Sequence, residues 1–482
     1  MPRVPKLSTR VKLVLLAALV AVVALAVYLY IRENSLPSPT FTNVVWEPEI
    51  IRAGQPVTFR LTVEHRGIFS VHVVIRVYAS KYAYSSFPKA VPVGYVEVEL
   101  GPGATKDVEF HWTPPEEGFY KLRFEIEGGG YLNQLVYAAP REGGPEAFTF
   151  VVFGDNRPSD GVMPQPPVFS EIAREVNLIH PDFAVLVGDV IYGYRSDIAR
   201  LKRQWSDFLS VYNSFEVPVF VAPGNHEMQT ENVPESGSLD AQTLYVMNLG
   251  RLYYAFAYGN SLFIVLDTDV VGQAAEISGE QLEWLKKMLE LSRNYTHTFV
   301  FMHRPVVSYE GADLLNNHYE ILPLLLRYNV TAVFQGHNHV YYYEEVNGTL
   351  FYVTGGAGAP LHRTPERGGV YHFLLVEVNG SSVNVKFVPP HAIKVRQLES
   401  SVEITYAFTE KIVFSSDGYT WVAEPASLRL RGLRVRSSSS DVEVEGGRML
   451  YTWSLDGAYE AYVEVVVRPG EKREIRLVTH KA

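Results

Sequence analysis

The sequence predicts an α/β domain flanked by two β-rich segments. Between residues 148 and 390, strand-like stretches alternate with helix-like stretches, which indicates a sheet covered by helices on both faces. From residue 41 to 128 and from 402 to 479, apolar and polar residues alternate in twos, as in half-buried strands. A chain of 482 residues is too long for one core, so we expect domains at 41–147, 148–390 and 391–482.

Composition excludes several classes of protein. A net charge of −10 gives no basic surface, so nucleic acid is not expected as the main partner. Cysteine is absent, which excludes a disulfide framework, a zinc finger and a thiol nucleophile. Any bound metal must therefore be held by oxygen and nitrogen atoms.

The amino-terminal region predicts a membrane anchor. Residues 13–31 carry no charge and would reach about 28 Å as a helix, near the hydrocarbon thickness of a bilayer. Basic residues in 1–12 predict that this end stays in the cytoplasm and that the rest of the chain lies outside. A cleaved signal peptide is the alternative, but the apolar run exceeds the usual 7–15 residues and no small-residue cleavage site follows it.

The first β-rich segment predicts an antiparallel β-sandwich. Its alternating strands are separated by turns such as 101–103, and the stretches 48–63 and 94–110 resemble immunoglobulin-like modules of secreted proteins. Its aromatic residues, Trp112 and Tyr120 among them, are expected in the core. The second β-rich segment, 391–482, predicts a small β-domain, with ligand binding or shielding of a sheet edge as alternative roles.

Local signals place helices in the α/β region. Residues 168–179 and 197–212 have helical patterns, and Ser278 to Gln281 has the spacing of a capping box before a further helix. Residues 319–328 predict another helix, provided that Pro323 lies in its first turn.

Chemistry-bearing side chains follow five apolar strands in this region. Because the carboxyl ends of strands in an open α/β sheet share one edge, these side chains are expected to converge. Pro223 and Gly224, for example, are expected to turn the chain after a strand, and three polar residues, Asn225 to Glu227, follow them. The five strand ends lead to Gly154-Asp155-Asn156-Arg157, Gly188-Asp189, Gly224-Asn225-His226-Glu227, His303-Arg304 and Gly336-His337-Asn338-His339.

In kind and order, these motifs resemble those of the calcineurin-like metallophosphoesterase family, over about residues 148–390. The resemblance implies a four-layer αββα sandwich and metal-dependent hydrolysis of phosphate mono- or diesters by hydroxide on two divalent ions. Manganese, iron and zinc all suit nitrogen and oxygen ligands. The substrate would be a small-molecule, lipid or nucleotide phosphate ester, and it would be hydrolysed on the outer side of the membrane.

The resemblance also implies roles for individual residues. Asp189 would bridge both metals, His226 would donate a proton to the leaving oxygen, and Glu227 would orient His226. The first metal would be held by Asp155, Asp189 and His339, and the second by Asp189, Asn225, His303 and His337.

One position departs from the family pattern. Arg157 stands where the family has a histidine ligand, and a guanidinium cannot replace that ligand. The first site could be completed by water or Asn156, could be weak or exchangeable, or could be absent in a single-metal enzyme. We interpret Arg157 as a contact to the substrate phosphate, with an ion pair to a nearby carboxylate as the alternative.

Other residues give weaker signals. The glycine-rich run 354–360, Arg304, His362 and Arg363 are candidates to line the site, whereas Asp267 is expected to be structural. A non-catalytic alternative is a cell-surface binding protein that retains the fold and has lost the first metal site through Arg157.

Overall fold

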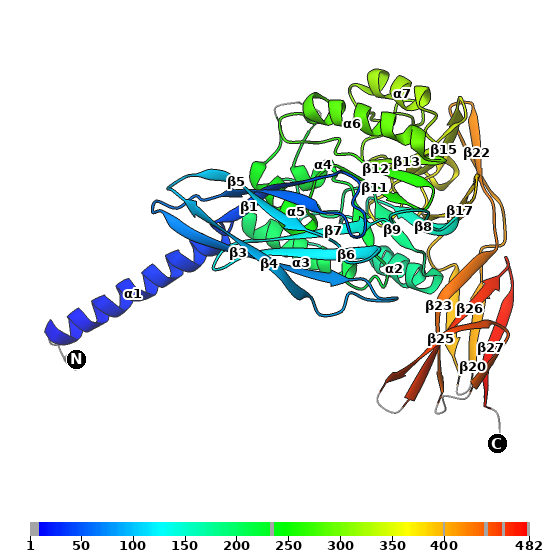
Figure 1. The fold of residues 1–482 in the computed structure, drawn as a ribbon, viewed down its shortest axis with the longest axis horizontal. Helices are drawn as coiled ribbons and strands as arrows, with labels where there is room; N and C mark the ends of the chain where they lie inside the picture. Colours follow the sequence, from blue (N-terminus) through cyan, green and yellow to red (C-terminus); the bar gives the residue numbers. More distant parts are fainter. Residues whose placement is uncertain (1–8, 232–235, 399–400, 438–441, 456–457, 480–482) are drawn as a thin grey trace, which may run out of the picture.

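The computed structural model describes residues 9–231, 236–398, 401–437, 442–455 and 458–479. A helix projects from one end of the molecule, and the C-terminal sheets lie at the other end (Figure 1). Between them lie an N-terminal β-sandwich and an α/β domain. Strand β8 begins at residue 147 and β19 at residue 393, close to the expected domain limits.

Two mixed sheets form the α/β domain. In the first, β10, β9 and β8 are parallel and β17 and β18 continue the sheet antiparallel. In the second, β12, β13, β14 and β16 are parallel and both edge strands, β11 and β15, are antiparallel. The first has the order β10-β9-β8-β17-β18, and the second has the order β11-β12-β13-β14-β16-β15. Their bounds are β8 Ala147–Phe153, β9 Phe183–Leu186, β10 Val219–Val221, β11 Tyr254–Tyr258, β12 Ser261–Val265, β13 His297–Met302, β14 Ala332–Gln335, β15 Tyr341–Val346, β16 Thr349–Thr354, β17 Phe373–Asn379 and β18 Ser382–Val388.

Aromatic side chains join the two sheets face to face. The ring of Phe150 on β8 lies 5.3 Å from that of Phe263 on β12 and 5.1 Å from that of Phe299 on β13. On the other face of β8, Phe153 contacts Phe169 of α2 at 6.2 Å. Edge-to-face and offset packing of this kind stabilises a core beyond the area that it buries.

Helices flank these sheets on two sides (Figure 1). Helices α6 and α7 lie on the side of the second sheet, and α2 and α3 lie on the opposite side, which fits the predicted αββα layers. The predicted helices at 168–179 and 197–212 are present. The bounds are α2 Pro167–Ile179, α3 Ile198–Tyr212, α4 Asn225–Met228, α5 Leu239–Leu249, α6 Gly279–Leu291 and α7 His318–Arg327, with short 3₁₀ helices at Ser292–Asn294 and Pro365–Arg367.

Two local predictions in these helices were wrong. Pro323 lies in the middle of α7, and the hydrogen bond that it removes would have gone to residue 319 in the exposed first turn. Ser278 makes no capping hydrogen bond; its hydroxyl donates to Gln273. The side chain of Gln281 instead bonds the main chain of Asp267 at both its N–H and its carbonyl, at 2.8 and 2.7 Å.

The N-terminal unit is an antiparallel β-sandwich, as predicted, whereas its immunoglobulin-like character stays a prediction. The rings of Phe59 and Phe124 meet across its two sheets at 5.7 Å, and Trp112 and Tyr120 are buried in its core. The sheets have the orders β1-β2-β5 and β4-β3-β6-β7, with bounds β1 Thr40–Glu47, β2 Val57–Glu64, β3 Val71–Lys81, β4 Val91–Leu100, β5 Thr105–Trp112, β6 Gly118–Ile126 and β7 Tyr131–Ala138.

The C-terminal unit is entirely β within the described residues. Its sheets have the orders β19-β20-β27-β24, β23-β26-β25 and β21-β22. The bounds are β19 Ile393–Gln397, β20 Ser401–Tyr406, β21 Ile412–Ser416, β22 Tyr419–Ala423, β23 Leu428–Ser437, β24 Val442–Glu445, β25 Arg448–Leu455, β26 Ala458–Val467 and β27 Lys472–Thr479.

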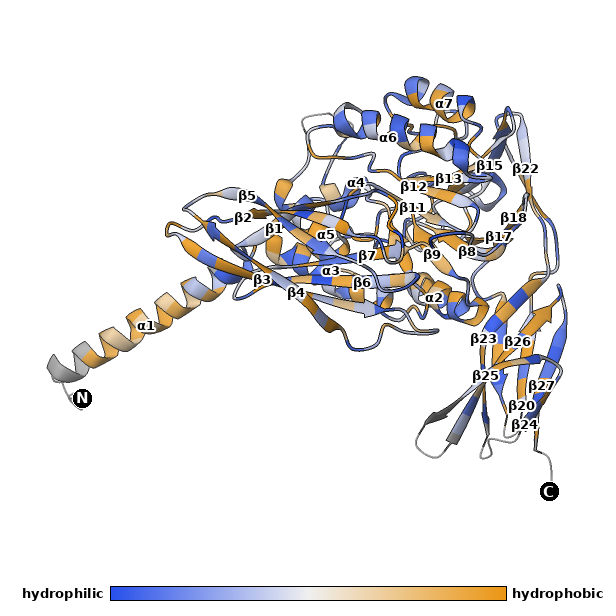
Figure 2. Ribbon diagram, viewed as in Figure 1, coloured by the Kyte–Doolittle hydropathy of each residue, from blue (hydrophilic) through white to orange (hydrophobic). Residues whose placement is uncertain are grey.

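Helix α1 (Thr9–Glu33) contains the apolar stretch predicted at 13–31, and Figure 2 shows hydrophobic colour along most of it. A membrane span takes about 20 consecutive apolar residues. No helix in the described part of the chain is long and apolar enough to cross a bilayer, so the predicted transmembrane anchor is not supported. Most of the predicted cytoplasmic segment, 1–12, lies outside the described residues.

Glu49 fastens the N-terminal sandwich to the α/β domain. Its carboxylate accepts hydrogen bonds from Arg251 Nη1 at 3.0 Å, from the N–H of Ala255 at 3.1 Å and from Trp284 Nε1 at 2.9 Å. The side chain of Arg251 is only 7% exposed and lies over the ring of Trp46. Loss of the carboxylate would therefore leave a buried guanidinium without its anionic partner.

We predict that Glu49→Ala lowers the free energy of unfolding by about 3 kcal/mol, as expected when one partner of a buried ion pair is removed. Urea unfolding followed by tryptophan fluorescence measures the change. The control is Glu109→Ala, which removes a half-exposed partner of Arg60 and should cost less than about 1 kcal/mol. Equal losses in the two variants would contradict a special role for Glu49.

Candidate functional site

The ends of five strands place the predicted ligands in one centre. Strands β8, β9 and β10 of the first sheet lead to Asp155, Asp189 and Asn225. Strands β13 and β14 of the second sheet lead to His303 and to the pair His337 and His339. All but His337 are less than 9% exposed, and the side chain of His337 is 14% exposed. The six residues expected to bind metal therefore come together, as the sequence predicted.

Four of these residues direct their donor atoms at one another. His303 Nε2 lies 2.9 Å from Asn225 Oδ1 and 3.2 Å from Asp189 Oδ1. His337 Nδ1 lies 3.0 Å from Asn225 Oδ1 and 3.3 Å from His303 Nε2. His303 Nδ1 bonds the carbonyl of Val187 at 2.8 Å, which leaves Nε2 as the ligand atom. This set of one carboxylate, one amide and two imidazoles fits the predicted second divalent ion.

Asp155 and His339, predicted to hold the first metal with Asp189, form a pair of their own beside Asp189. His339 Nε2 lies 3.3 Å from Asp155 Oδ1, and His339 Nδ1 bonds the carbonyl of Pro360 at 2.6 Å. Ligand atoms of Asp155, Asp189 and His303 all lie within 4.8 Å of one another. The residues present thus provide a carboxylate, a bridging carboxylate and an imidazole for the first metal.

Arg157 also reaches into the centre. Its Nε lies 3.3 Å from Asp189 Oδ2, and its side chain is 14% exposed. The alternative interpretation of Arg157, an ion pair with a nearby carboxylate, is therefore observed. The partner is Asp189, the residue predicted to bridge the two metals. Asn156, considered as a replacement ligand, donates its amide to Gln165 at 2.9 Å, while its buried Oδ1 has no hydrogen-bond partner among the described residues.

Neighbouring charges set the protonation of the residues in the centre. Burial alone would raise the pKa of Asp189. In the acidic range where this carboxyl could take up a proton, the positive charges of His226, His303 and Arg157 hold its pKa well below the usual range. Burial favours neutral His303, yet the carboxylate of Asp189 raises its pKa to about 10. An ionised carboxylate in this buried place therefore requires positive charge beside it, which a protonated histidine or a metal ion can supply.

His226 lies beside this cluster. Its Nδ1 bonds the main-chain carbonyl of Tyr192, and its Nε2 lies 3.7 Å from Asp189 Oδ2. Burial lowers the pKa of His226 to about 4, so the ring is neutral near pH 7 in this environment. The carbonyl of Tyr192 therefore orients the ring of His226, a role that the family resemblance implied for Glu227.

Glu227 joins two loops instead of orienting His226. One carboxylate oxygen accepts from the N–H groups of Gly224 and Asp189 at 2.8 and 3.0 Å. The other accepts from Val190 and Ile191 at 2.7 and 3.1 Å. Burial and the nearby charge of Asp189 raise the pKa of Glu227 to about 7. The predicted contact with His226 was wrong because the loop after β9 lies closer to this carboxylate.

Sequence reasoning missed several supports of the ligands. The hydroxyl of Tyr194 accepts a hydrogen bond from Asn225 Nδ2 at 2.6 Å, which turns Asn225 Oδ1 toward the histidines. His337 Nε2 lies 2.8 Å from Asp313 Oδ2. The position of Tyr194, five residues after Asp189, was a usable signal, whereas nothing near Asp313 in the sequence indicated this contact.

Arg304 and His362 were candidates to line the site. Arg304 is fully buried, and its Nε lies 2.9 and 3.0 Å from the two carboxylate oxygens of Asp269, so it acts as a structural support. The imidazole of His362 stacks on His339 at 3.9 Å between ring centres, next to the predicted first site.

Glycines allow the main chain to approach the ligands closely. A Cβ at Gly336 would lie 2.6 Å from Asp155 Oδ2. Gly188 has a φ of +88°, and a Cβ there would lie 2.7 Å from His303 Nδ1. A side chain at either position would displace a ligand, so both strand-end motifs require glycine.

Comparisons with known proteins found a family model, curated proteins and solved structures that match part of this chain. The model of the calcineurin-like phosphoesterase family matches residues 148–341. The chain is 29% identical over 267 residues to tartrate-resistant acid phosphatase type 5 of Homo sapiens, covering 47% of this chain and 78% of that protein. It is 26% identical over 188 residues to 3',5'-cyclic adenosine monophosphate phosphodiesterase CpdA of Haemophilus influenzae, covering 37% and 63%. A solved dimetal phosphatase from Danio rerio aligns with a TM-score of 0.37 and 17% identity, covering 53% of this chain and 95% of that one.

We predict that Glu227→Gln lowers the free energy of unfolding of the metal-free protein by about 2 kcal/mol, because an amide NH₂ would face N–H groups in place of a carboxylate oxygen. Urea unfolding after chelation measures the loss. Glu231→Gln makes the same change at an exposed position four residues later and should have no measurable effect. An unchanged stability of Glu227→Gln would show that the two loops do not depend on this carboxylate.

Proposed function

We propose that this chain, whose residues 148–341 belong to the calcineurin-like phosphoesterase family, hydrolyses phosphate esters with divalent metal ions bound at the centre described above. The observation that carries the proposal is the convergence of Asp189, Asn225, His303 and His337. Their facing atoms lie within 2.9–3.3 Å of a neighbour in the set. Side chains from two different sheets thus direct nitrogen and oxygen atoms at one point, and this donor set suits a divalent transition-metal ion.

The proposed centre has residues for two metal ions. Asp189, Asn225, His303 and His337 would hold one ion, and Asp155, Asp189 and His339 would hold the other. When bound, such ions provide hydroxide at neutral pH and neutralise charge on the phosphoryl oxygens. Manganese, iron and zinc all suit these donors, and the sequence and geometry do not select one.

Residues of the chain itself would position the ester. His226 Nδ1 is held by the carbonyl of Tyr192, so Nε2 is free to face the substrate. A phosphate anion opposite this nitrogen would favour the protonated ring, which could then give its proton to the leaving oxygen. His226 is therefore the proposed general acid.

The substrate class is proposed at the level of phosphate mono- or diesters. The names of the two relatives, an acid phosphatase and a cyclic-nucleotide phosphodiesterase, support both kinds of ester. Attachment to a membrane has no support from the described helices. The extracytoplasmic location of the domain stays a prediction.

We predict that the chelated protein regains hydrolysis of 4-nitrophenyl phosphate or bis(4-nitrophenyl) phosphate when manganese, iron or zinc is added, and that the ratio of the two rates identifies the preferred ester. Asp189→Asn should lose at least about 100-fold in kcat, because the carboxylate shared by both sites loses its charge. Elemental analysis should show less bound metal. Asp107→Asn, on an exposed strand of the N-terminal sandwich, is the control.

The same experiment separates the enzyme from the binding-protein alternative. The contact of Arg157 with Asp189 is the observation that favours the alternative, because a guanidinium there opposes a second cation. Tight metal binding without hydrolysis of either ester would favour a binding protein. Absence of metal binding would contradict both the site and the proposed reaction.

We predict that Arg157→Ala tightens binding of the more weakly held metal about tenfold, since removal of a positive charge near Asp189 Oδ2 lowers electrostatic repulsion at that side. Isothermal titration with Mn²⁺ measures affinity and stoichiometry. Arg195→Ala, an exposed arginine in the loop after Asp189, should leave both unchanged. If Arg157→Ala raises KM for the ester and leaves metal binding unchanged, Arg157 is a substrate contact instead.

A further inference from the structure

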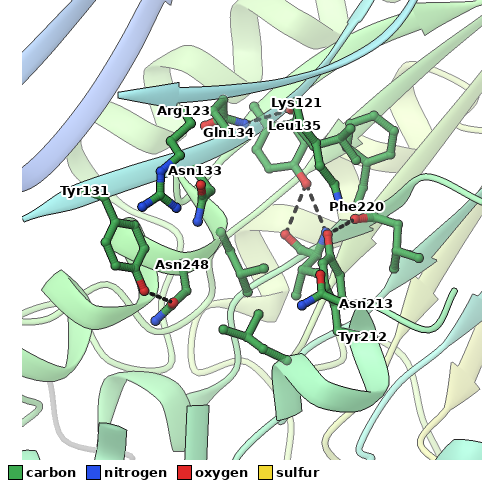
Figure 3. A pocket seen from close by; sticks show the side chains of 15 residues that line it. Lys121, Arg123, Tyr131, Asn133, Gln134, Leu135, Tyr212, Asn213, Phe220 and Asn248 are labelled. Atoms are coloured by element: carbon green, nitrogen blue, oxygen red, sulfur yellow. Dashed lines mark hydrogen bonds between the residues drawn. The ribbon is translucent and has the colours of Figure 1, made fainter. Parts of the chain in front are cut away.

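A cavity lies between the N-terminal sandwich and the α/β domain, and none of the proposed metal ligands lines it. Its volume is about 360 Å³, within the range of small-molecule sites. Strands β6 and β7 form one wall, and α3, α5 and β10 form the others (Figure 3). Pockets between domains are common places for ligands because neither domain alone closes them.

Positive charge lines this cavity. The ammonium group of Lys121 lies 4.5 Å from the ring centre of Phe87 and 5.6 Å from that of Tyr212, and within the described residues it has no carboxylate partner. Burial lowers the pKa of Lys121, as expected for a cation that no anion compensates. Arg123 is the second cation, and its Nε pairs with exposed Glu125 at 3.1 Å.

The remaining lining combines free amides with an apolar floor. Asn133 of β7 and Asn213 at the end of α3 come from opposite walls (Figure 3). Neither side chain makes a hydrogen bond with any other residue in the described part of the chain. Leu135, Leu209 and Phe220 supply apolar surface between them. Such a lining suits a ligand with one anionic group and one apolar ring or chain.

We propose that this cavity binds a small organic anion that carries an aromatic or other apolar group, with Lys121 pairing with the anionic group. The anion supplies the counter-charge that Lys121 lacks, and the apolar part covers the floor formed by Leu135 and Phe220. A ligand in this place contacts β10, whose end is four residues before Asn225. Binding here is independent of the proposed phosphoesterase reaction.

The test is isothermal titration of the full, metal-free chain with 1-naphthalenesulfonate, beside the neutral isostere 1-naphthalenesulfonamide. The expected result is binding of the sulfonate at micromolar concentration, and at least tenfold weaker binding of the sulfonamide. Lys121→Met retains the packing of the side chain on Phe87 and removes the charge, so it should weaken sulfonate binding at least tenfold. Lys106→Met, the same change on exposed strand β5, should leave it unchanged.

A second variant keeps the test decisive if Lys121→Met folds poorly. Asn213→Asp adds a carboxylate at an exposed position on the cavity wall and should also weaken sulfonate binding severalfold, by like-charge repulsion. No binding of the sulfonate up to millimolar concentration would overturn the proposal. Equal affinity in the Lys121→Met and Lys106→Met variants, or equal affinity for sulfonate and sulfonamide, would overturn it as well.

Discussion

The buried carboxylates of Asp155 and Asp189 impose the electrostatic constraint on which the centre depends. A buried carboxylate is costly unless hydrogen bonds and positive charge surround it. Asp155 receives the main-chain N–H of His337, and Asp189 receives that of His226. The two carboxylates also need positive charge nearby. Imidazoles, the guanidinium of Arg157 and the proposed metal ions supply it at this point. The proposed metal centre thus depends on two anions placed at the ends of buried strands.

The centre exists only because two sheets pack together. One sheet supplies the aspartates and Asn225, and the other supplies His303, His337 and His339, so a displacement between the sheets would separate each carboxylate from its histidines. Phe150 fixes this packing from the core, at ring distances near 5 Å. At the rim, Glu227 binds main-chain N–H groups after β9 and β10 and holds the two loops in register.

The N-terminal sandwich packs against the side of the α/β domain where β10 lies, with the ring of Phe119 6.0 Å from that of Phe220. Strand β10 is at the edge of its sheet, and the hydroxyls of Tyr212, Tyr245 and Tyr254 bond its main chain where a further strand would otherwise pair. The sandwich packs beyond this edge. Glu49 hydrogen-bonds it to the α/β domain, and the cavity lined by Lys121 lies between the two domains. The strand that delivers Asn225 and His226 thus lies between the metal centre and the domain interface.

Local sequence patterns were sufficient for the strands, for α2 and α3, and for the convergence of the six candidate ligands, because apolar periodicity and strand-end residues are local signals. They placed Pro323 in the first turn of α7, whereas the helix tolerates it in the middle because the affected turn is exposed. They also predicted a capping hydrogen bond for Ser278, whose hydroxyl donates to the neighbouring side chain of Gln273. They also missed the partner of Glu227, which lies in another loop, and gave no sign of Asp313. By itself, the sequence determined which residues stand at strand ends and therefore which chemistry meets at the edge of the sheets. Only the tertiary structure decided that Arg157 faces Asp189 and that Glu227 binds main-chain N–H groups, since such contacts depend on how the loops pack and not on the residues next to them in the chain.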